Sequence, residues 1–329
     1  MADDVPHGQA AQARERVRLR AFPPPGCETD CSAPSNRSCR RPKEVHSDRR
    51  SDQATIAVTG ATGRVGGRVA RRLAAAGVPQ RLAVRDPGRA PDLPGATAVR
   101  CAYGEPGAAA ALEGAEVLFM VSASESPDRL DRHRAFVDDA ARAGVRHVVY
   151  LSFFGAAPDA VFTLARDHWA TEQHLRGSGL SCTFLRDNLY ADFMPALVGE
   201  DGVIRGPAGE GRAAVVAQDD IADAATAVLL RPDAHAGRTY DLTGPHALTM
   251  AEVAAVLSRA SGRTVTYRPE TVEEAYRSRA SYGAPDWQVD AWVSTYTAIA
   301  AGQLDGVSDD MRRLTGHAAT PLADVVSAP

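Results

Sequence analysis

Three glycines, Gly60, Gly63 and Gly66, carry the clearest chemical signal in the sequence. They follow the apolar, β-branched run 55–59 and open a segment of helical periodicity at 64–76. A strand that turns tightly into a helix leaves the first backbone N–H groups of that helix without partners, and these groups favour an anion such as a pyrophosphate. The spacing therefore predicts a dinucleotide site. The residues expected to contact the cofactor here are Gly60, Thr62, Gly63, Arg64, Val65 and Gly66.

The end of the second predicted strand bears on which dinucleotide binds. In such a site an acid at this point binds the ribose 2′-hydroxyl of NAD. Here Arg85 comes first, and a guanidinium suits the 2′-phosphate of NADP. Asp86 is the opposing observation, although it could serve only to cap the turn at Pro87-Gly88. We therefore expect NADP (NADPH), with NAD less favoured. Arg64 could add a phosphate contact or be a solvated arginine at the start of the helix.

Small residues follow the fourth and fifth predicted strands. Ser122, Ala123 and Ser124 come directly after the fourth, and Ser152 ends the fifth. The carboxyl ends of parallel strands border the ligand crevice in this kind of fold. The first three residues would leave room for a ribose and nicotinamide, and are expected to contact the cofactor. Ser152 is a candidate catalytic residue in the same crevice, or a hydroxyl that only satisfies backbone groups.

Strands and helices alternate from residue 54 onward, which predicts a doubly wound parallel sheet, the Rossmann fold. The second half is less regular and predicts a small substrate lobe, mostly within 191–211 and 244–329. In it, 202–207 indicates a loop or short hairpin, 219–224 has acidic N-cap candidates, Thr249 caps a helix and 286–301 is helical. The predicted strands, all expected to be buried, are 55–59, 80–84, 97–101, 115–121, 146–152 and 180–185, and the helices between them are 64–76, 107–113, 128–143 and 162–177.

Composition narrows the class of protein. The chain has 329 residues, 44% of them hydrophobic, and a formal net charge of −4, which gives no electrostatic case for binding nucleic acid or an anionic membrane. No apolar run approaches the roughly 20 residues that span a bilayer, and no secretory signal is visible. These features favour a cytoplasmic protein. We also expect a small-molecule substrate and a monomer or homodimer.

Residues 1–53 differ from the remainder in having few large apolar residues and no clear period. We expect a disordered extension, or a start assigned upstream of the real domain. Its Cys27, Cys31, Cys39 and His46 lack the spacing of a standard zinc site, so no metal is expected. The single lysine of the chain, Lys43, also lies here, which leaves none in the predicted folded region for catalysis.

Several segments together resemble the NmrA-like group of atypical short-chain dehydrogenase/reductases, and most closely its bacterial NAD(P)H:quinone oxidoreductase-like branch. The resemblance covers roughly 54–329. It rests on the Gly60–Gly66 spacing, Arg85, 151–156, 219–224, 282–287 and 314–317. It implies a Rossmann-type fold and an NAD(P)H-linked role, either as a reductase or as a redox sensor.

The resemblance also exposes a departure. Standard members of the superfamily use a Tyr-x-x-x-Lys pair, but Leu164 stands at the tyrosine position and His168 at the lysine position. Cys101-Ala102-Tyr103 replaces the acid that many relatives place near the adenine. His168 could orient the ribose or donate a proton, or be a half-buried helix histidine. By resemblance, 184–190 lines the substrate crevice.

Without the pair, the acceptor must need little acid help. A simple ketone becomes an alkoxide whose conjugate acid is about as weak as water, whereas a quinone becomes a phenolate-like anion whose conjugate acid has a pKa of about 10. We therefore expect an NADPH-dependent reductase of quinone-like or other activated acceptors. A non-catalytic NADP(H) sensor and a reductase of a biosynthetic enone or imine remain alternatives. The candidate catalytic residues are Ser152, His168, Asn188 and Tyr190, with packing as the alternative for Tyr190, and Phe153, Phe154 and Phe193 as a candidate aromatic wall.

Overall fold

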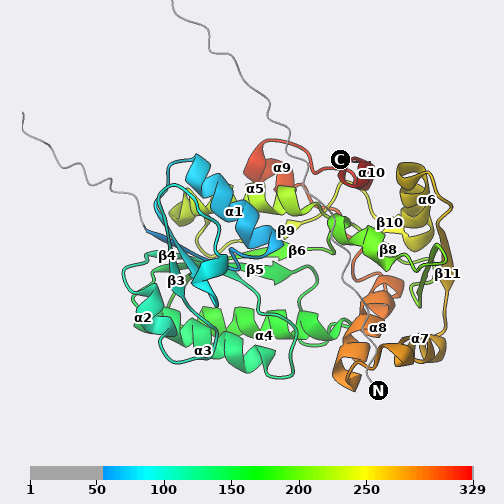
Figure 1. The fold of residues 1–329 in the computed structure, drawn as a ribbon, viewed down its shortest axis with the longest axis horizontal. Coiled ribbons are helices and arrows are strands. Elements are labelled where there is room, and N and C mark those ends of the chain that lie inside the picture. The colour runs from blue at the N-terminus through cyan, green and yellow to red at the C-terminus, as the bar shows by residue number, and fades with distance from the viewer. Residues whose placement is uncertain (1–54, 328–329) are drawn as a thin grey trace, which may run out of the picture. The chain divides into compact units, whose positions relative to one another are not determined.

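A seven-stranded parallel sheet forms the centre of the computed structural model, which describes residues 55–327 (Figure 1). Its order is β3-β2-β1-β4-β5-β6-β9, so the direction of strand succession reverses between β1 and β4. This confirms the doubly wound fold, in which ligands bind beyond the carboxyl ends of the strands at the reversal. The strands are β1 (Ile56–Thr59), β2 (Gln80–Val84), β3 (Ala96–Arg100), β4 (Val117–Val121), β5 (His147–Phe153), β6 (Ser181–Asp187) and β9 (Thr239–Leu242).

Helices cover both faces of the sheet. Helices α1 (Arg64–Ala75) and α5 (Gln218–Leu229) lie on one face, and α2 (Ala108–Leu112), α3 (Arg129–Arg142) and α4 (Thr163–Gly177) lie on the other (Figure 1). Successive strand residues serve opposite faces, because side chains alternate along a strand. Val58 thus belongs to the cluster beneath α1 and α5, and Ala57 to the cluster beneath α2 and α3. The same alternation decides below which side chains can reach the site.

Two local expectations differ from the structure. The strand expected at 97–101 is present, but it is the edge strand β3 and is largely exposed, because it pairs with β2 alone. The acids at 219–224 do not cap α5, whose N-cap is Ala217 with no side-chain bond. Asp219 instead forms ion pairs with Arg68 and Arg72 of α1, which tie the two helices of this face together.

The second half builds a lobe beside the carboxyl ends of the strands. The segment 202–207, expected to be a loop or short hairpin, instead contains β7 (Val203–Gly206), paired in parallel with the distant β11 (Thr266–Pro269). Thr249 does cap a helix, through a capping box with Glu252. The remaining elements of this part are η2 (Ala191–Leu197), β8 (Arg212–Ala213), β10 (Leu248–Thr249), α6 (Met250–Ser261), α7 (Val272–Arg279), η4 (Ala280–Tyr282), α8 (Asp286–Ala300) and α10 (Leu322–Ser327).

One stretch of the expected lobe returns to the sheet. Helix α9 (Asp310–Thr315) packs against α5 and β9, and its Met311 joins the core cluster beneath α1 and α5. The reason is local: the Asp310 carboxylate accepts a hydrogen bond from the backbone N–H of Asp241 in β9, at 3.0 Å. The lobe is therefore interrupted at 310–315, inside the expected range 244–329.

Some expectations lie outside the described residues. They concern the extension 1–53 with Lys43, and the set of Cys27, Cys31, Cys39 and His46. Within 55–327, no helix has both the length and the apolar character needed to cross a bilayer.

Candidate active site

The glycine turn between β1 and α1 has the geometry that a pyrophosphate requires. Gly60 has φ +65°, and its carbonyl accepts a hydrogen bond from the N–H of Gly63 at 2.8 Å. A Cβ on Gly66 would lie 2.3 Å from the Gly60 oxygen, so only glycine lets the helix start this close to the strand. No side chain caps the N-terminus of α1. The first-turn N–H groups are thus open to an anion, as the dinucleotide hypothesis requires.

The other expected cofactor contacts of this turn differ in their exposure to solvent. Thr62 and Arg64 are exposed. Val65 is buried and packs in the core cluster beneath α1, so only its backbone N–H faces the turn. These positions are compatible with cofactor contacts by Thr62, Arg64 and the Val65 backbone, which remain predictions.

Arg85 directly follows β2, beside the glycine turn, because β2 pairs with β1. It is exposed, and its guanidinium makes no hydrogen bond or ion pair with any residue of 55–327. Asp86 behaves as a turn cap, since its Oδ1 accepts from the N–H of Gly88 at 3.0 Å. A cation at this edge fits a 2′-phosphate, whereas Asp86, the residue that would favour the 2′-hydroxyl of NAD, has its Oδ1 in the turn.

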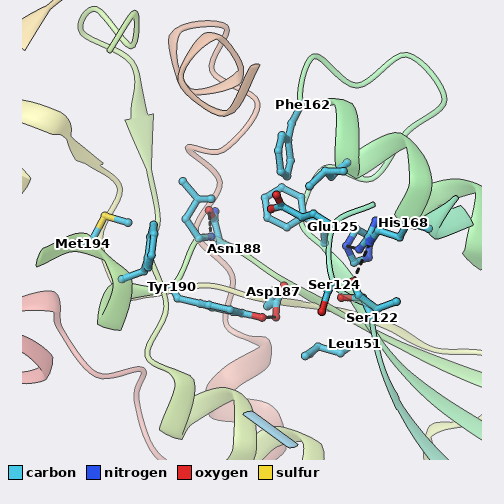
Figure 2. A pocket seen from close by; sticks show the side chains of 16 residues that line it. Ser122, Ser124, Glu125, Leu151, Phe162, His168, Asp187, Asn188, Tyr190 and Met194 are labelled. Carbon is cyan, nitrogen blue, oxygen red and sulfur yellow. Dashed lines mark hydrogen bonds between the residues drawn. The ribbon is translucent and has the colours of Figure 1, made fainter. Parts of the chain in front are cut away.

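A cavity of about 290 Å³ opens beyond the carboxyl ends of β4, β5 and β6 (Figure 2). Its volume is at the lower end of the roughly 300–1,000 Å³ typical of small-molecule sites. Phe193, 51% exposed, stands on the side of η2. The wall is mostly apolar, with a few polar groups between. The lining residues are Ser122, Ala123, Ser124, Glu125, Arg129, Leu151, Phe153, Phe162, Leu164, His168, Asp187, Asn188, Leu189, Tyr190, Phe193 and Met194.

A buried arginine fixes the protonation state of His168. Arg129 donates from one guanidinium nitrogen to His168 Nε2 at 2.9 Å, from another to Asp167 at 3.2 Å, and from Nε to the Ala123 carbonyl at 3.1 Å. Arginine can only donate, so Nε2 must accept. The imidazole is then neutral, with its proton on Nδ1, which bonds to the Tyr150 oxygen at 2.9 Å. Both nitrogens of His168 are engaged, which argues against the expected role as proton donor.

A second buried histidine holds the strand end that borders the cavity. His133 of α3 accepts at Nε2 from the N–H of Ala123, at 2.8 Å, and its Nδ1 lies 2.9 Å from Thr171 Oγ1. Because Nε2 accepts, this imidazole too is neutral. Arg129 and His133 together fix both backbone groups of Ala123. The loop Ser122–Ser124, expected to border the nicotinamide, is therefore fixed in position by these two side chains of α3.

Two candidate catalytic residues have their polar atoms in structural bonds. Ser152 is fully buried and does not line the cavity. Side chains alternate along β5, so Ser152 points to the face opposite to the cavity-lining Leu151 and Phe153. Its Oγ donates to Glu172 on α4 at 2.7 Å. This corrects its expected place in the crevice. Asn188 does line the cavity. Its Nδ2 donates to the Leu304 carbonyl at 3.0 Å, and its Oδ1 accepts from the Leu189 N–H.

Tyr190 and Asp187 form the remaining polar pair of the cavity. The Tyr190 hydroxyl donates to Asp187 Oδ2 at 3.0 Å, and Figure 2 shows the two side chains meeting between the strands and η2. Burial raises the pKa of both groups well above their ordinary values, and the bond from Tyr190 opposes part of the shift at Asp187. Of the expected aromatic wall, Phe153 and Phe193 line the cavity and Phe154 does not.

The neutral histidines predict acid sensitivity. Burial lowers the pKa of His133 to about 3, and burial with the Arg129 charge holds that of His168 well below its ordinary value. Each histidine has a lower pKa in the folded protein than in the unfolded chain. The stability that the neutral histidines contribute is therefore fully present above about pH 6.5 and is lost as the pH falls below that value. Lowering the pH from about 7.5 to 5 should therefore remove about 2 kcal/mol of unfolding free energy through His133, and His168 should add to this loss. Urea unfolding at pH 7.5 and at pH 5 tests this. The unfolding free energy of His133→Gln should fall less between the two pH values than that of the wild type, and equal falls would refute the explanation.

One cluster of potential metal ligands lies outside the cavity. Asp220, Asp223 and His317 offer atoms within 4.8 Å of one another. Their carboxylate oxygens already have partners, because Asp220 accepts from the N–H and Oγ1 of Thr320, and Asp223 pairs with Arg72 and His317. These contacts explain the cluster without an ion.

Sequence reasoning missed Arg129, His133 and Asp187. Arg129 and His133 are four residues apart on the helix after the fourth strand, and so share one face. That spacing was the available signal, but charged and polar helix residues are usually exposed. Asp187 stands within the segment 184–190 that was expected to line the crevice, and its burial was the missing information.

Comparison with known proteins identifies the family to which this chain belongs. The NmrA-like family profile matches residues 52–284. The NAD(P)H azoreductase of Xenophilus azovorans is 34% identical over 280 residues, which cover 83% of this chain and 97% of the relative. The Escherichia coli NADPH-dependent quinone oxidoreductase, solved with NADPH, is 34% identical with a TM-score of 0.75, covering 83% of this chain and 98% of that one. The Citrobacter sp. triphenylmethane reductase complexed with NADP(H) is 32% identical with a TM-score of 0.73, covering 82% and 98%. The chain therefore belongs to the NmrA-like family, in the branch that contains bacterial quinone reductases.

Proposed function

We propose that this protein is an NADPH-dependent reductase that transfers hydride to a flat, quinone-like acceptor in the cavity beyond β4, β5 and β6. It is an NAD(P)H-dependent oxidoreductase, and NADPH supplies the hydride when bound. The observation that carries the choice of acceptor is the cavity itself. It is mostly apolar, opens at the carboxyl ends of the strands, and contains neither a lysine nor a free histidine. A cytoplasmic location is part of the proposal.

The residues of the chain would divide the task between the two ends of the cofactor. The uncapped start of α1 would hold the pyrophosphate, and Arg85 the 2′-phosphate. The loop Ser122–Ser124, fixed through Ala123 by Arg129 and His133, would set the depth of the nicotinamide. Holding the two reactants at a defined separation can supply much of the rate enhancement.

Two of the candidate catalytic residues, Asn188 and His168, do not favour a ketone as the acceptor. Asn188 is held by Leu304, and His168 has both nitrogens engaged, so neither is free to protonate an alkoxide. A quinone needs much less help, because its reduced anion is a far weaker base than an alkoxide. Apolar side chains such as Leu151, Phe153 and Met194 suit a flat ring.

The test compares acceptors at saturating NADPH. Oxidation should be rapid with benzoquinone or naphthoquinone, and at least about 100-fold slower with acetophenone, because hydride transfer to a ketone builds a far more basic anion than hydride transfer to a quinone does. Tight NADPH binding with no turnover of any quinone would contradict the proposal and favour a redox sensor. Faster turnover of an enone or imine than of any quinone would favour a biosynthetic reductase.

A further inference from the structure

The side chain of Asp187 is a carboxyl group in a buried environment, which disfavours its ionised form. It ends β6, lines the cavity and is 4% exposed. Its side-chain partner within 55–327 is the Tyr190 hydroxyl, and no ion pair reaches it in that range. A buried carboxylate without a cation is unstable, and the group then keeps its proton. Burial accordingly holds the pKa of Asp187 well above its ordinary value.

We propose that Asp187 is the proton donor of this site and delivers the proton that reduction of a quinone-like acceptor requires. The inference rests on the proposed function. Quinone reduction to hydroquinone adds one hydride and one proton. The hydride leaves NADPH, which becomes NADP⁺. The Asp187 O–H bond breaks as the new O–H bond of the product forms, and the carboxylate left behind regains a proton from water.

Tyr190 is the positioning residue for this step. Its hydroxyl donates to Oδ2, which leaves the acid proton of Asp187 on Oδ1. The same bond strengthens once the carboxylate forms, because hydrogen bonds to an ionised acceptor are stronger. Proton release is thereby made easier at the moment of reduction, although burial favours the acid form beforehand.

The other charged or titratable groups near the cavity are either engaged with other residues or exposed, and so do not compete with Asp187 as proton donor. Nearby titratable or charged groups are Glu125, Arg129 from α3, His168 from α4 and Asp192 from η2. The Arg129 guanidinium is shared among Asp167, His168 and the Ala123 carbonyl, and so does not neutralise Asp187. Asp192 is bonded to Gln218 and Arg68. Glu125 is exposed, so it lacks the environment that stores a proton at Asp187.

Two flat aromatic acceptors, one that needs a proton and one that does not, separate an acid role of Asp187 from a structural one. Naphthoquinone needs a hydride and a proton, whereas the flat cation N-methylacridinium becomes neutral on receiving a hydride alone. The Asp187→Asn variant keeps the shape and still accepts from Tyr190, but has no acidic proton. It should reduce naphthoquinone about 10-fold or more slowly, and N-methylacridinium within about twofold of the wild type, after subtraction of the uncatalysed rate.

A pH profile and a spectrum supply independent readouts. The wild-type naphthoquinone rate should fall as pH rises through the pKa of Asp187, and the variant should lack that limb. Infrared spectra of the cofactor-free protein at neutral pH should show a protonated-carboxyl band that Asp187→Asn removes.

Three results would overturn the inference: equal losses with both acceptors, no loss with either, or absence of the infrared band. A wild type that reduces N-methylacridinium but no quinone contradicts the acid role together with the proposed acceptor. A wild type that binds NADPH and reduces neither contradicts reductase function itself.

Discussion

Replacing Gly66 with alanine is expected to lower NADPH affinity about 100-fold or more. The new Cβ would lie 2.3 Å from the Gly60 oxygen and 2.7 Å from the Thr59 oxygen, both of them backbone atoms that cannot rotate away. Helix α1 must then move off β1, and the first-turn N–H groups leave the position where a pyrophosphate would meet them. The same shift should cost about 1–3 kcal/mol of unfolding free energy. Fluorescence titration with NADPH and urea unfolding measure the two effects.

Gly177→Ala is the matched control. Gly177 ends α4, is exposed, and has no atom within 4 Å of the place where its Cβ would be. Alanine there should leave NADPH affinity unchanged and stability equal or slightly higher. Equal affinities for NADPH in Gly66→Ala and Gly177→Ala would show that the dinucleotide does not depend on the turn after β1.

Replacing Arg85 with alanine is expected to weaken NADPH about 10- to 100-fold and NADH little. The reason is that a charge-assisted hydrogen bond to the 2′-phosphate contributes about 1.5–3 kcal/mol, and NADH has no such phosphate. Arg85 is exposed and makes no side-chain hydrogen bond or ion pair within 55–327, so the substitution should leave the unfolding free energy nearly unchanged. Isothermal titration with each dinucleotide measures the difference.

Arg231→Ala controls for the loss of a positive charge. Arg231 is exposed and follows α5, near the amino ends of the strands and thus at the opposite edge of the sheet. It should alter neither affinity. Equal weakening of NADPH and NADH by Arg85→Ala would assign Arg85 to a part common to both dinucleotides, and would leave the preference for NADP without a basis in this residue.

The fold and the cofactor end could be read from the sequence because local chemistry specifies them. Gly60 and Gly66 are required by a positive φ and a close backbone approach, and both requirements act within ten residues. Apolar runs bounded by glycines likewise gave the six strands β1 to β6 with small errors at their ends. The lobe was less predictable, since β7 pairs with β11 about sixty residues later and no local signal selects that partner.

The substrate end was harder because its residues owe their roles to tertiary packing. Ser152 has a suitable side chain at a suitable strand end, yet the phase of β5 turns it towards Glu172. His168 is at the cavity, but Arg129, from another helix, occupies its Nε2. Asp187 gains its character from burial and Tyr190 together. Residue type indicated candidates at this end, and the environment decided what each can do.

The central claim is hydride transfer from NADPH to a quinone in the cavity beyond β4, β5 and β6. Rapid mixing of the NADPH-loaded enzyme with naphthoquinone, in a single turnover, tests it most directly. The account predicts that the reduced-nicotinamide absorbance disappears in a fast phase, and that this phase slows when the transferred hydrogen at C4 is replaced by deuterium. Persistent absorbance from tightly bound NADPH in the presence of excess quinone would contradict it.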